Sequence, residues 1–216
     1  ISLGLVGSEM CIRDSNKNSN IIQDLALKEE YTRPLQQFRK RILYANAYNT
    51  DFQVPTATAA FLSKDSKYPH ERVINDRDDD DDGMFALRVE TKPKQLEQDD
   101  QNVDPCEATD ALGWTKVFCD TRDKVPLPSI PIPFVSRNNK LSPEQSTFTS
   151  SELYEHLTRT QDRFVFPLGH TVMVANSKNS IYSRINQNGR PLMDRLAADM
   201  IHDIETMADD ILKEKK

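Results

Sequence analysis

The chain has 216 residues, of which 37% are hydrophobic and 29% are charged, and its formal net charge at pH 7 is −6. This length suits one domain or slightly more, and the low apolar fraction indicates that part of the chain lies outside any core. The acidic balance argues against a dedicated nucleic-acid-binding protein, since clustered lysines and arginines are needed to hold a phosphate backbone.

Two further features limit the class of protein. No run approaches the roughly 18 apolar residues that a membrane-spanning helix needs. The three cysteines lie far apart and form no CxxC pair, so we expect neither a disulfide framework nor a zinc knuckle. Together these features favour a reducing, cytoplasmic location.

The beginning of the chain calls for a separate interpretation. Residues 1–15 read ISLGLVGSEMCIRDS, and residues 2–15 are similar to a translated sequencing adapter. We therefore treat residues 1–15 as an artefact outside the fold. On this interpretation the natural protein extends further upstream, and the chain is a C-terminal piece of it.

Residues 16–62 form the first organised block. Apolar residues between positions 21 and 38 recur at helical spacing, with a break or restart expected near Pro34. The apolar run at 41–46 predicts a short strand buried on both faces, as in a parallel sheet. Pro55 then starts a further short helix. This alternation of helices with a strand predicts an α/β fold.

Residues 63–110 are richer in acidic side chains. We expect an acidic low-complexity insertion here, poorly ordered at 76–82 and 95–108, with a short edge strand at 84–89. Part of the acidic run fits the pattern D-x-D-x-D-G of a calcium loop, but Val89 stands where that loop needs a glutamate. We therefore expect a solvated segment and no metal site.

Residues 111–216 form the second organised block. A proline-rich segment within it either packs on the surface as a connector or covers a lipid-facing entrance. The sequence predicts a strand at 112–120, an extended proline-rich stretch at 125–134, a polar helix at 143–157, and strands at 163–166 and 171–175.

The clearest pattern is an apolar stripe near the C-terminus. Its members step by three or four positions and predict one helix that docks on the core through this stripe. They are Met193, Leu196, Met200, Ile204, Met207 and Ile211. We further expect the strand at 42–45 to lie parallel to and beside the strand at 115–118, or beside the strand that precedes His170.

Two residues are candidates for chemistry. Asp51 follows a buried strand, which in an open α/β sheet is the edge where catalytic groups collect. It either caps the helix at Pro55 or orients a histidine. His170 follows a predicted strand and a glycine, and it is either an ordinary loop histidine or a general base. The order of Asp51 before His170 fits the nucleophile, acid, histidine order of α/β-hydrolases, with the serine upstream.

The stretches around these residues resemble one known family. FRKRILYAN at 38–46, DFQVP at 51–55, and RFV at 163–165 followed by GHTVMV at 169–174 look like parts of the lipase-like serine esterases. These are eukaryotic α/β-hydrolases similar to the fungal lipid-droplet phospholipase. The resemblance is to the C-terminal half of the family and has a poorly matching middle.

The resemblance implies the C-terminal part of an α/β-hydrolase fold, a parallel sheet with flanking helices. It implies a Ser-Asp-His triad that hydrolyses lipid esters without a cofactor, with Asp51 as the acid and His170 as the base. The serine and the oxyanion hole would precede residue 16, so this chain alone would be inactive. Peripheral contact with lipid droplets or internal membranes would fit such a substrate. The alternative is a non-catalytic α/β interaction module that binds a partner through its acidic segment.

Overall fold

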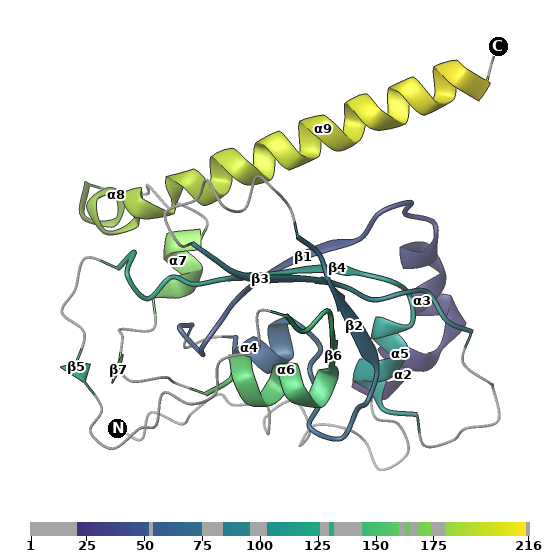
Figure 1. The fold of residues 1–216 in the computed structure, drawn as a ribbon, viewed down its shortest axis with the longest axis horizontal. Helices are drawn as coiled ribbons and strands as arrows, with labels where there is room; N and C mark the ends of the chain where they lie inside the picture. The colour runs from purple at the N-terminus through teal and green to yellow at the C-terminus, as the bar shows by residue number, and fades with distance from the viewer. Residues whose placement is uncertain are drawn as a thin grey trace.

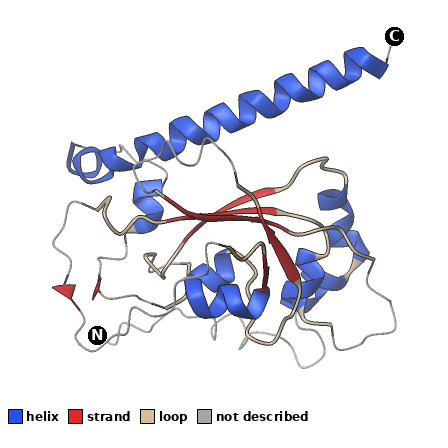
Figure 2. Ribbon diagram, viewed as in Figure 1, coloured by secondary structure: helices blue, strands red, loops and turns tan. Residues whose placement is uncertain are grey.

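A five-stranded sheet forms the centre of the molecule, with helices on both of its faces (Figure 1, Figure 2). The computed structural model describes residues 21–51, 54–74, 84–95, 103–125, 130–131, 144–159, 163–164, 168–173 and 180–214. In spatial order the strands are β1 (Ile42–Asn46), β4 (Thr115–Cys119), β3 (Phe85–Glu90), β2 (Pro69–Arg72) and β6 (Thr147–Thr149). The described part of the chain therefore has a mixed α/β fold.

The sheet is parallel at one end and antiparallel at the other. β1 and β4 run parallel with Tyr44 opposite Val117, which confirms the predicted pairing. β3 is antiparallel to β4, β2 is antiparallel to β3, and β6 is antiparallel to β2. β3 lies between β4 and β2, where Leu87 and Val89 are buried, so the predicted edge position of this strand is wrong.

The segment at 63–110 contributes more to the sheet than its composition indicates. It supplies β2, β3 and helix α5 (Pro105–Asp110), so its described parts belong to the same fold and are not an insertion outside it. Residues 103–108, expected to be poorly ordered, include the start of α5. The Asp104 carboxylate accepts from the Cys106 backbone N–H at 2.8 Å and so caps this helix. Residues 76–82 lie outside the described residues.

Apolar side chains fill both faces of the sheet. On one face, Phe118 packs with Leu153 beneath helices α4 (Thr56–Ala59) and α6 (Ser150–Leu157). On the other face, Val117 packs with Leu192 at the start of helix α9 (Arg190–Glu214). Val117 and Phe118 are consecutive and serve opposite clusters, because side chains alternate between the faces of a strand.

The predicted N-terminal helical region is confirmed as two helices, α2 (Ile21–Leu27) and α3 (Glu29–Gln36). The break falls at Lys28, whose backbone is extended, and Pro34 lies inside α3. The Arg41 guanidinium donates to the carbonyl oxygens of Leu35 at 3.0 Å and Phe38 at 2.6 Å. Arg41 thereby links the start of β1 to the end of α3.

The helix predicted from residue 143 starts only at Ser150, because residues 147–149 form β6. A capping box fixes this boundary: the Thr149 hydroxyl accepts from the Glu152 N–H at 3.2 Å, and the Glu152 carboxylate accepts from the Thr149 N–H at 2.7 Å. Both members of the box are visible in the sequence.

The predicted strand at 171–175 is wrong over residues 171–173, which belong to helix α7 (Gly169–Met173). The Val172 N–H bonds to the Leu168 carbonyl at 3.1 Å, a helical contact, and the Val172 side chain is buried. A short apolar run with β-branched residues satisfies the burial requirement of either structure, so its local pattern cannot choose between them.

Three small elements complete this region. β5 (Ile130–Pro131) pairs antiparallel with β7 (Arg163–Phe164) in a separate two-stranded sheet. The first is the described part of the proline-rich segment and has the extended backbone expected there. α8 (Ser180–Asn186) and a 3-10 turn at Gln187–Gly189 lead into α9.

The predicted C-terminal helix is confirmed as α9, but its docking is different from the prediction. The apolar contact between α9 and the sheet core is made near the beginning of the helix, through Leu192. Much of the apolar stripe is exposed, so the expectation that the whole stripe packs on the core is wrong. Figure 1 shows α9, in yellow, extending well past the sheet.

Candidate functional site

A cluster of buried polar side chains lies at the carboxyl ends of the two parallel strands. Asn46 ends β1, Thr50 and Asp51 follow it, and Thr121 follows β4. The Thr50 and Thr121 hydroxyls are 2.8 Å apart, and the Thr121 hydroxyl donates to Asn46 Oδ1 at 3.4 Å. Asn46 Nδ2 is 3.5 Å from Asp51 Oδ2. The predicted location of Asp51, at the carboxyl edge of a parallel pair, is therefore confirmed.

The turn that leads from β1 to Asp51 has unusual backbone geometry. Tyr48 and Asn49 have φ values of 61° and 50°, in the left-handed region that non-glycine residues seldom adopt. The Arg122 guanidinium carbon lies 3.9 Å from the centre of the Tyr48 ring and helps to hold the turn. Strained turns of this kind concentrate at functional sites, because the surrounding structure must hold them.

Asn49 caps the first N–H of α4. The N-cap position is Pro55, and the Thr56 N–H donates to Asn49 Oδ1 at 3.0 Å. In return, the Thr56 hydroxyl accepts from the Asn49 N–H at 3.0 Å. Of the two roles considered for Asp51, the helix-capping role is thus performed by Asn49, two residues earlier.

The structure brings the segment before His170 next to Asp51. Asp51 and Leu168 form an antiparallel β-bridge, and the Gly169 N–H donates to the Thr50 carbonyl at 2.8 Å. A Cβ atom on Gly169 would lie 2.8 Å from that same oxygen and 2.9 Å from Asn46 Cγ, so the close approach requires glycine. The backbone at His170 therefore starts α7 beside the carboxyl edge.

The imidazole of His170 lies outside the described side chains. Contact between this ring and the Asp51 carboxylate therefore stays a prediction. What the structure adds is the juxtaposition of their two backbone segments, although more than a hundred residues separate them in the sequence.

A second group of polar residues was not anticipated from the sequence. Lys116 of β4, Asp110 at the end of α5 and His70 of β2 are all fully buried, and their side chains meet. Lys116 Nζ lies 2.5 Å from Asp110 Oδ1 and 3.0 Å from His70 Nε2, and it donates to the Ala60 carbonyl at 2.7 Å. We call these three side chains the Lys116 cluster.

His70 uses both ring nitrogens in the cluster. Nδ1 is 3.0 Å from the Tyr68 carbonyl oxygen, which can only accept, so Nδ1 carries the proton. Nε2 faces both Lys116 Nζ at 3.0 Å and Asp110 Oδ2 at 3.3 Å. Burial lowers the pKa of Lys116, and the neighbouring Asp110 carboxylate opposes that effect.

The Lys116 cluster is structural. All three side chains have no exposed surface, so a substrate has no access to them. It ties β2, β4 and α5 together with a charge pair that the low-dielectric interior strengthens. The sequence signal for it is the lysine within the apolar run of β4, but Asp110 falls in the stretch predicted to be an acidic insertion.

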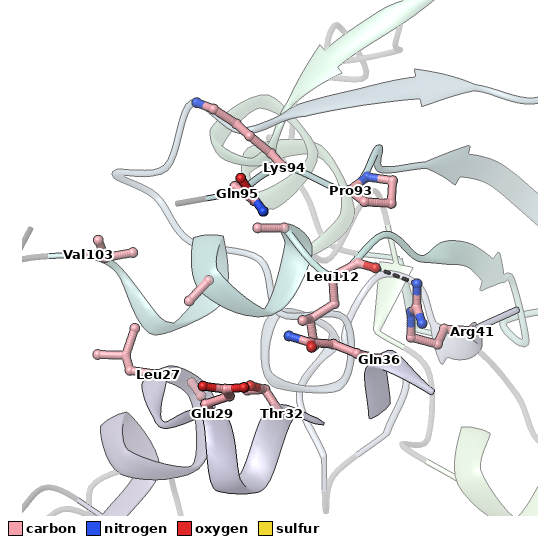
Figure 3. A pocket seen from close by; sticks show the side chains of 13 residues that line it. Leu27, Glu29, Thr32, Gln36, Arg41, Pro93, Lys94, Gln95, Val103 and Leu112 are labelled. Carbon is pink, nitrogen blue, oxygen red and sulfur yellow. Dashed lines mark hydrogen bonds between the residues drawn. The ribbon is translucent and has the colours of Figure 1, made fainter. Parts of the chain in front are cut away.

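A groove with a volume of about 1020 Å³ lies between α2, α3 and α5 (Figure 3). Its most obvious anion-binding group, the Arg41 guanidinium, already donates to the Leu112 carbonyl at 2.5 Å and the Gly113 carbonyl at 2.8 Å. Asp51 and the segment at 168–170 are not among its lining residues. The groove is therefore separate from the carboxyl-edge cluster.

The described residues contain neither a metal centre nor a membrane-spanning helix. No group of three or more His, Cys, Asp or Glu side chains there is arranged to hold a metal ion. Within the same residues, no helix has both the length and the apolarity needed to cross a membrane. The acidic run at 78–83, where the calcium pattern occurs, lies outside them.

Comparison with known proteins identifies no relative: no family model, no curated protein and no solved structure matches this chain.

Proposed function

We propose that this chain forms the C-terminal part of an α/β-hydrolase that cleaves lipid esters, with Asp51 as the triad acid and His170 as the general base. The observation that carries the proposal is the β-bridge between Asp51 and Leu168, which puts the His170 segment beside a buried carboxylate. A carboxylate in this position can hold an imidazole in one tautomer and stabilise its protonated form.

Three features of the site support the assignment of Asp51. It lies at the carboxyl end of a parallel strand pair, the usual location of catalytic groups in such sheets. It is buried, and Asn46 Nδ2 lies near one of its oxygens at 3.5 Å. The first N–H of α4 donates to Asn49 and not to Asp51. The lipid-ester substrate rests on the resemblance alone.

The proposal can be tested on this chain without a nucleophile. A carboxylate next to an imidazole favours the protonated ring, so the pH at which His170 titrates should fall by about one unit in Asp51→Asn. The measurement is an NMR titration of the histidine ring protons. The matched control is Asp120→Asn, which removes another carboxylate near the carboxyl end of β4. The Asp120 carboxylate pairs with Arg122 at 2.5 Å.

An unchanged His170 titration in Asp51→Asn would overturn the triad assignment and favour the non-catalytic interaction module. An equal shift in Asp120→Asn would show a general charge effect of this edge and would also overturn it. Where the natural protein supplies a G-x-S-x-G serine, Asp51→Asn should lower kcat for ester hydrolysis by about 10⁴-fold and preserve the fold.

A further inference from the structure

The first half of α9 is attached to the sheet by polar contacts. The Asp199 carboxylate accepts from Arg195 Nε at 3.0 Å, from Arg88 Nη2 at 3.3 Å and from the Tyr44 hydroxyl at 3.2 Å. Burial opposes the ionisation of Asp199, but Arg195 and Arg88 outweigh it and keep the pKa of Asp199 below its usual value. Farther along, Lys40 pairs with Asp203 at 2.5 Å.

The apolar side chains of α9 from Met200 to Leu212 point elsewhere. At 3.6 residues per turn they are rotated by roughly 120° from the side that carries Leu192 and Asp199. They are between 41% and 63% exposed, and they form one continuous strip that we call the α9 apolar face: Met200, Ile201, Ile204, Met207, Ile211 and Leu212.

Acidic residues border the α9 apolar face on both sides. The same helical geometry puts Asp203 on the border nearer the sheet, and Glu205 and Asp209 on the opposite border. From Met200 to Lys213 the helix carries four acidic residues and one lysine. An exposed apolar surface with a charged rim is the arrangement of a protein interaction site.

We propose that the α9 apolar face binds a basic amphipathic helix of another protein. The face is straight and extends over about 18 Å of helix, at 1.5 Å per residue, so a partner helix can lay its own i, i+3, i+4, i+7 apolar positions along it. Lysines or arginines beside those positions would meet the acidic border, as the flanking charges of paired helices do.

The acidic border of the α9 apolar face distinguishes between the possible binding partners. A second copy of the chain would bring Glu205 and Asp209 against the same acidic residues, and like charges across an interface oppose association. The acidic border would likewise repel an anionic bilayer, whose surface attracts polybasic segments. A basic helix is the occupant for which both the apolar face and its border are favourable.

The test uses the 216-residue chain and a fluorescein-labelled peptide of about 18 residues, with leucines at helical spacing and lysines elsewhere. A second peptide has glutamates in place of the lysines. Binding is followed by fluorescence anisotropy at physiological salt. Since the face is small compared with a standard interface, we expect a weak, fast-exchanging complex with the lysine peptide.

Three variants separate the contributions of the face and its border. Ile204→Ser combined with Met207→Ser keeps the charge and should weaken binding of the lysine peptide by about tenfold. Glu205→Lys combined with Asp209→Lys keeps the apolar face and should weaken it by about fivefold. His202→Ser, on the opposite side of α9, is the control and should bind as the unmodified chain does. All five positions are exposed, so folding should be unaffected.

Five results would overturn the proposal. The two peptides could bind equally well, or neither could bind. The serine double variant could retain full binding, which would show attraction by the net negative charge alone. Sedimentation could show a dimer that this double variant abolishes, which would make a second copy the occupant. Phosphatidylcholine vesicles could bind the unmodified chain but not the serine double variant, which would make a lipid surface the occupant.

Discussion

Removal of the Lys116 ammonium should destabilise the protein more than the loss of any exposed charge. In Lys116→Met the apolar stem is retained, but the Asp110 carboxylate, fully buried, loses the cation 2.5 Å away. Breaking a buried ion pair on one side costs about 3–5 kcal/mol, because an uncompensated charge stays in the interior. That is a large share of the roughly 5–15 kcal/mol by which a domain is stable.

A double-mutant cycle shows whether this loss comes from the pair. Asp110→Asn leaves a neutral amide, and Lys116→Met combined with Asp110→Asn removes both charges of the pair. The double variant should be less destabilised than the sum of the single variants, by about 2 kcal/mol or more. Lys92→Met provides the exposed control: Lys92 pairs with Glu71 at 2.5 Å near the same sheet, and its loss should cost less than about 1 kcal/mol.

Urea unfolding at pH 7 gives these free energies, with the single tryptophan, Trp114, as the fluorescent probe. Its indole N–H donates to the Thr109 carbonyl at 2.9 Å and its ring packs edge-on against Phe61, so unfolding changes its environment. A loss below about 1 kcal/mol in Lys116→Met, or additivity in the cycle, would refute a stabilising buried pair.

The pH dependence of the same comparison follows from the lowered pKa of Lys116. Between its folded-state pKa and the unfolded value of 10.5, the unfolded chain binds the additional proton, so this group makes stability rise with pH. The free-energy difference between the unmodified chain and Lys116→Met should therefore grow toward about pH 10. A constant difference would contradict the lowered pKa.

Two further predictions concern Gly169 and Cys106. Gly169→Ala puts a Cβ 2.8 Å from the Thr50 carbonyl oxygen, so overpacking should lower the free energy of unfolding by about 1–3 kcal/mol. The exposed control Ser183→Ala should change the urea midpoint little. Equal urea midpoints for Gly169→Ala and the unmodified chain would contradict the close approach. Burial and the nearby Asp104 carboxylate raise the pKa of Cys106 to about 12, so its thiol should stay protonated at pH 8. Iodoacetamide should therefore alkylate Cys106 much more slowly in the folded chain than in urea, and mass spectrometry of the peptide that contains Cys106 measures both rates. Equal rates would contradict the raised pKa of Cys106.

Several elements could be predicted because their signals are local. The apolar run at 41–46 and the run that contains Thr115–Cys119 indicated strands, and they pair in parallel as expected. The N-terminal helices and α9 followed from helical spacing, and Asp51 was located by the strand before it. In each case a period of two or of 3.6, or a boundary next to such a segment, carries the information.

Other features depended on which segments meet. The side chains of His70, Asp110 and Lys116 look unrelated in the sequence, and only the pairing of β2, β3 and β4 beside α5 makes them a buried cluster. Residues 171–173 have the composition of a strand, but their packing in the tertiary structure makes them a helix.

The sequence by itself thus indicated the two strands of the parallel pair, the long C-terminal helix and the position of Asp51 after a strand, since each depends on neighbours in the chain. It left two partners open for the strand at 42–45, and the tertiary structure selected β4. The tertiary structure decided which face of α9 is buried and which residue caps α4, and it put the Leu168–Gly169 backbone beside Asp51. The physical reason is that burial and close approach are set by contacts between segments distant in sequence, which a local period does not encode.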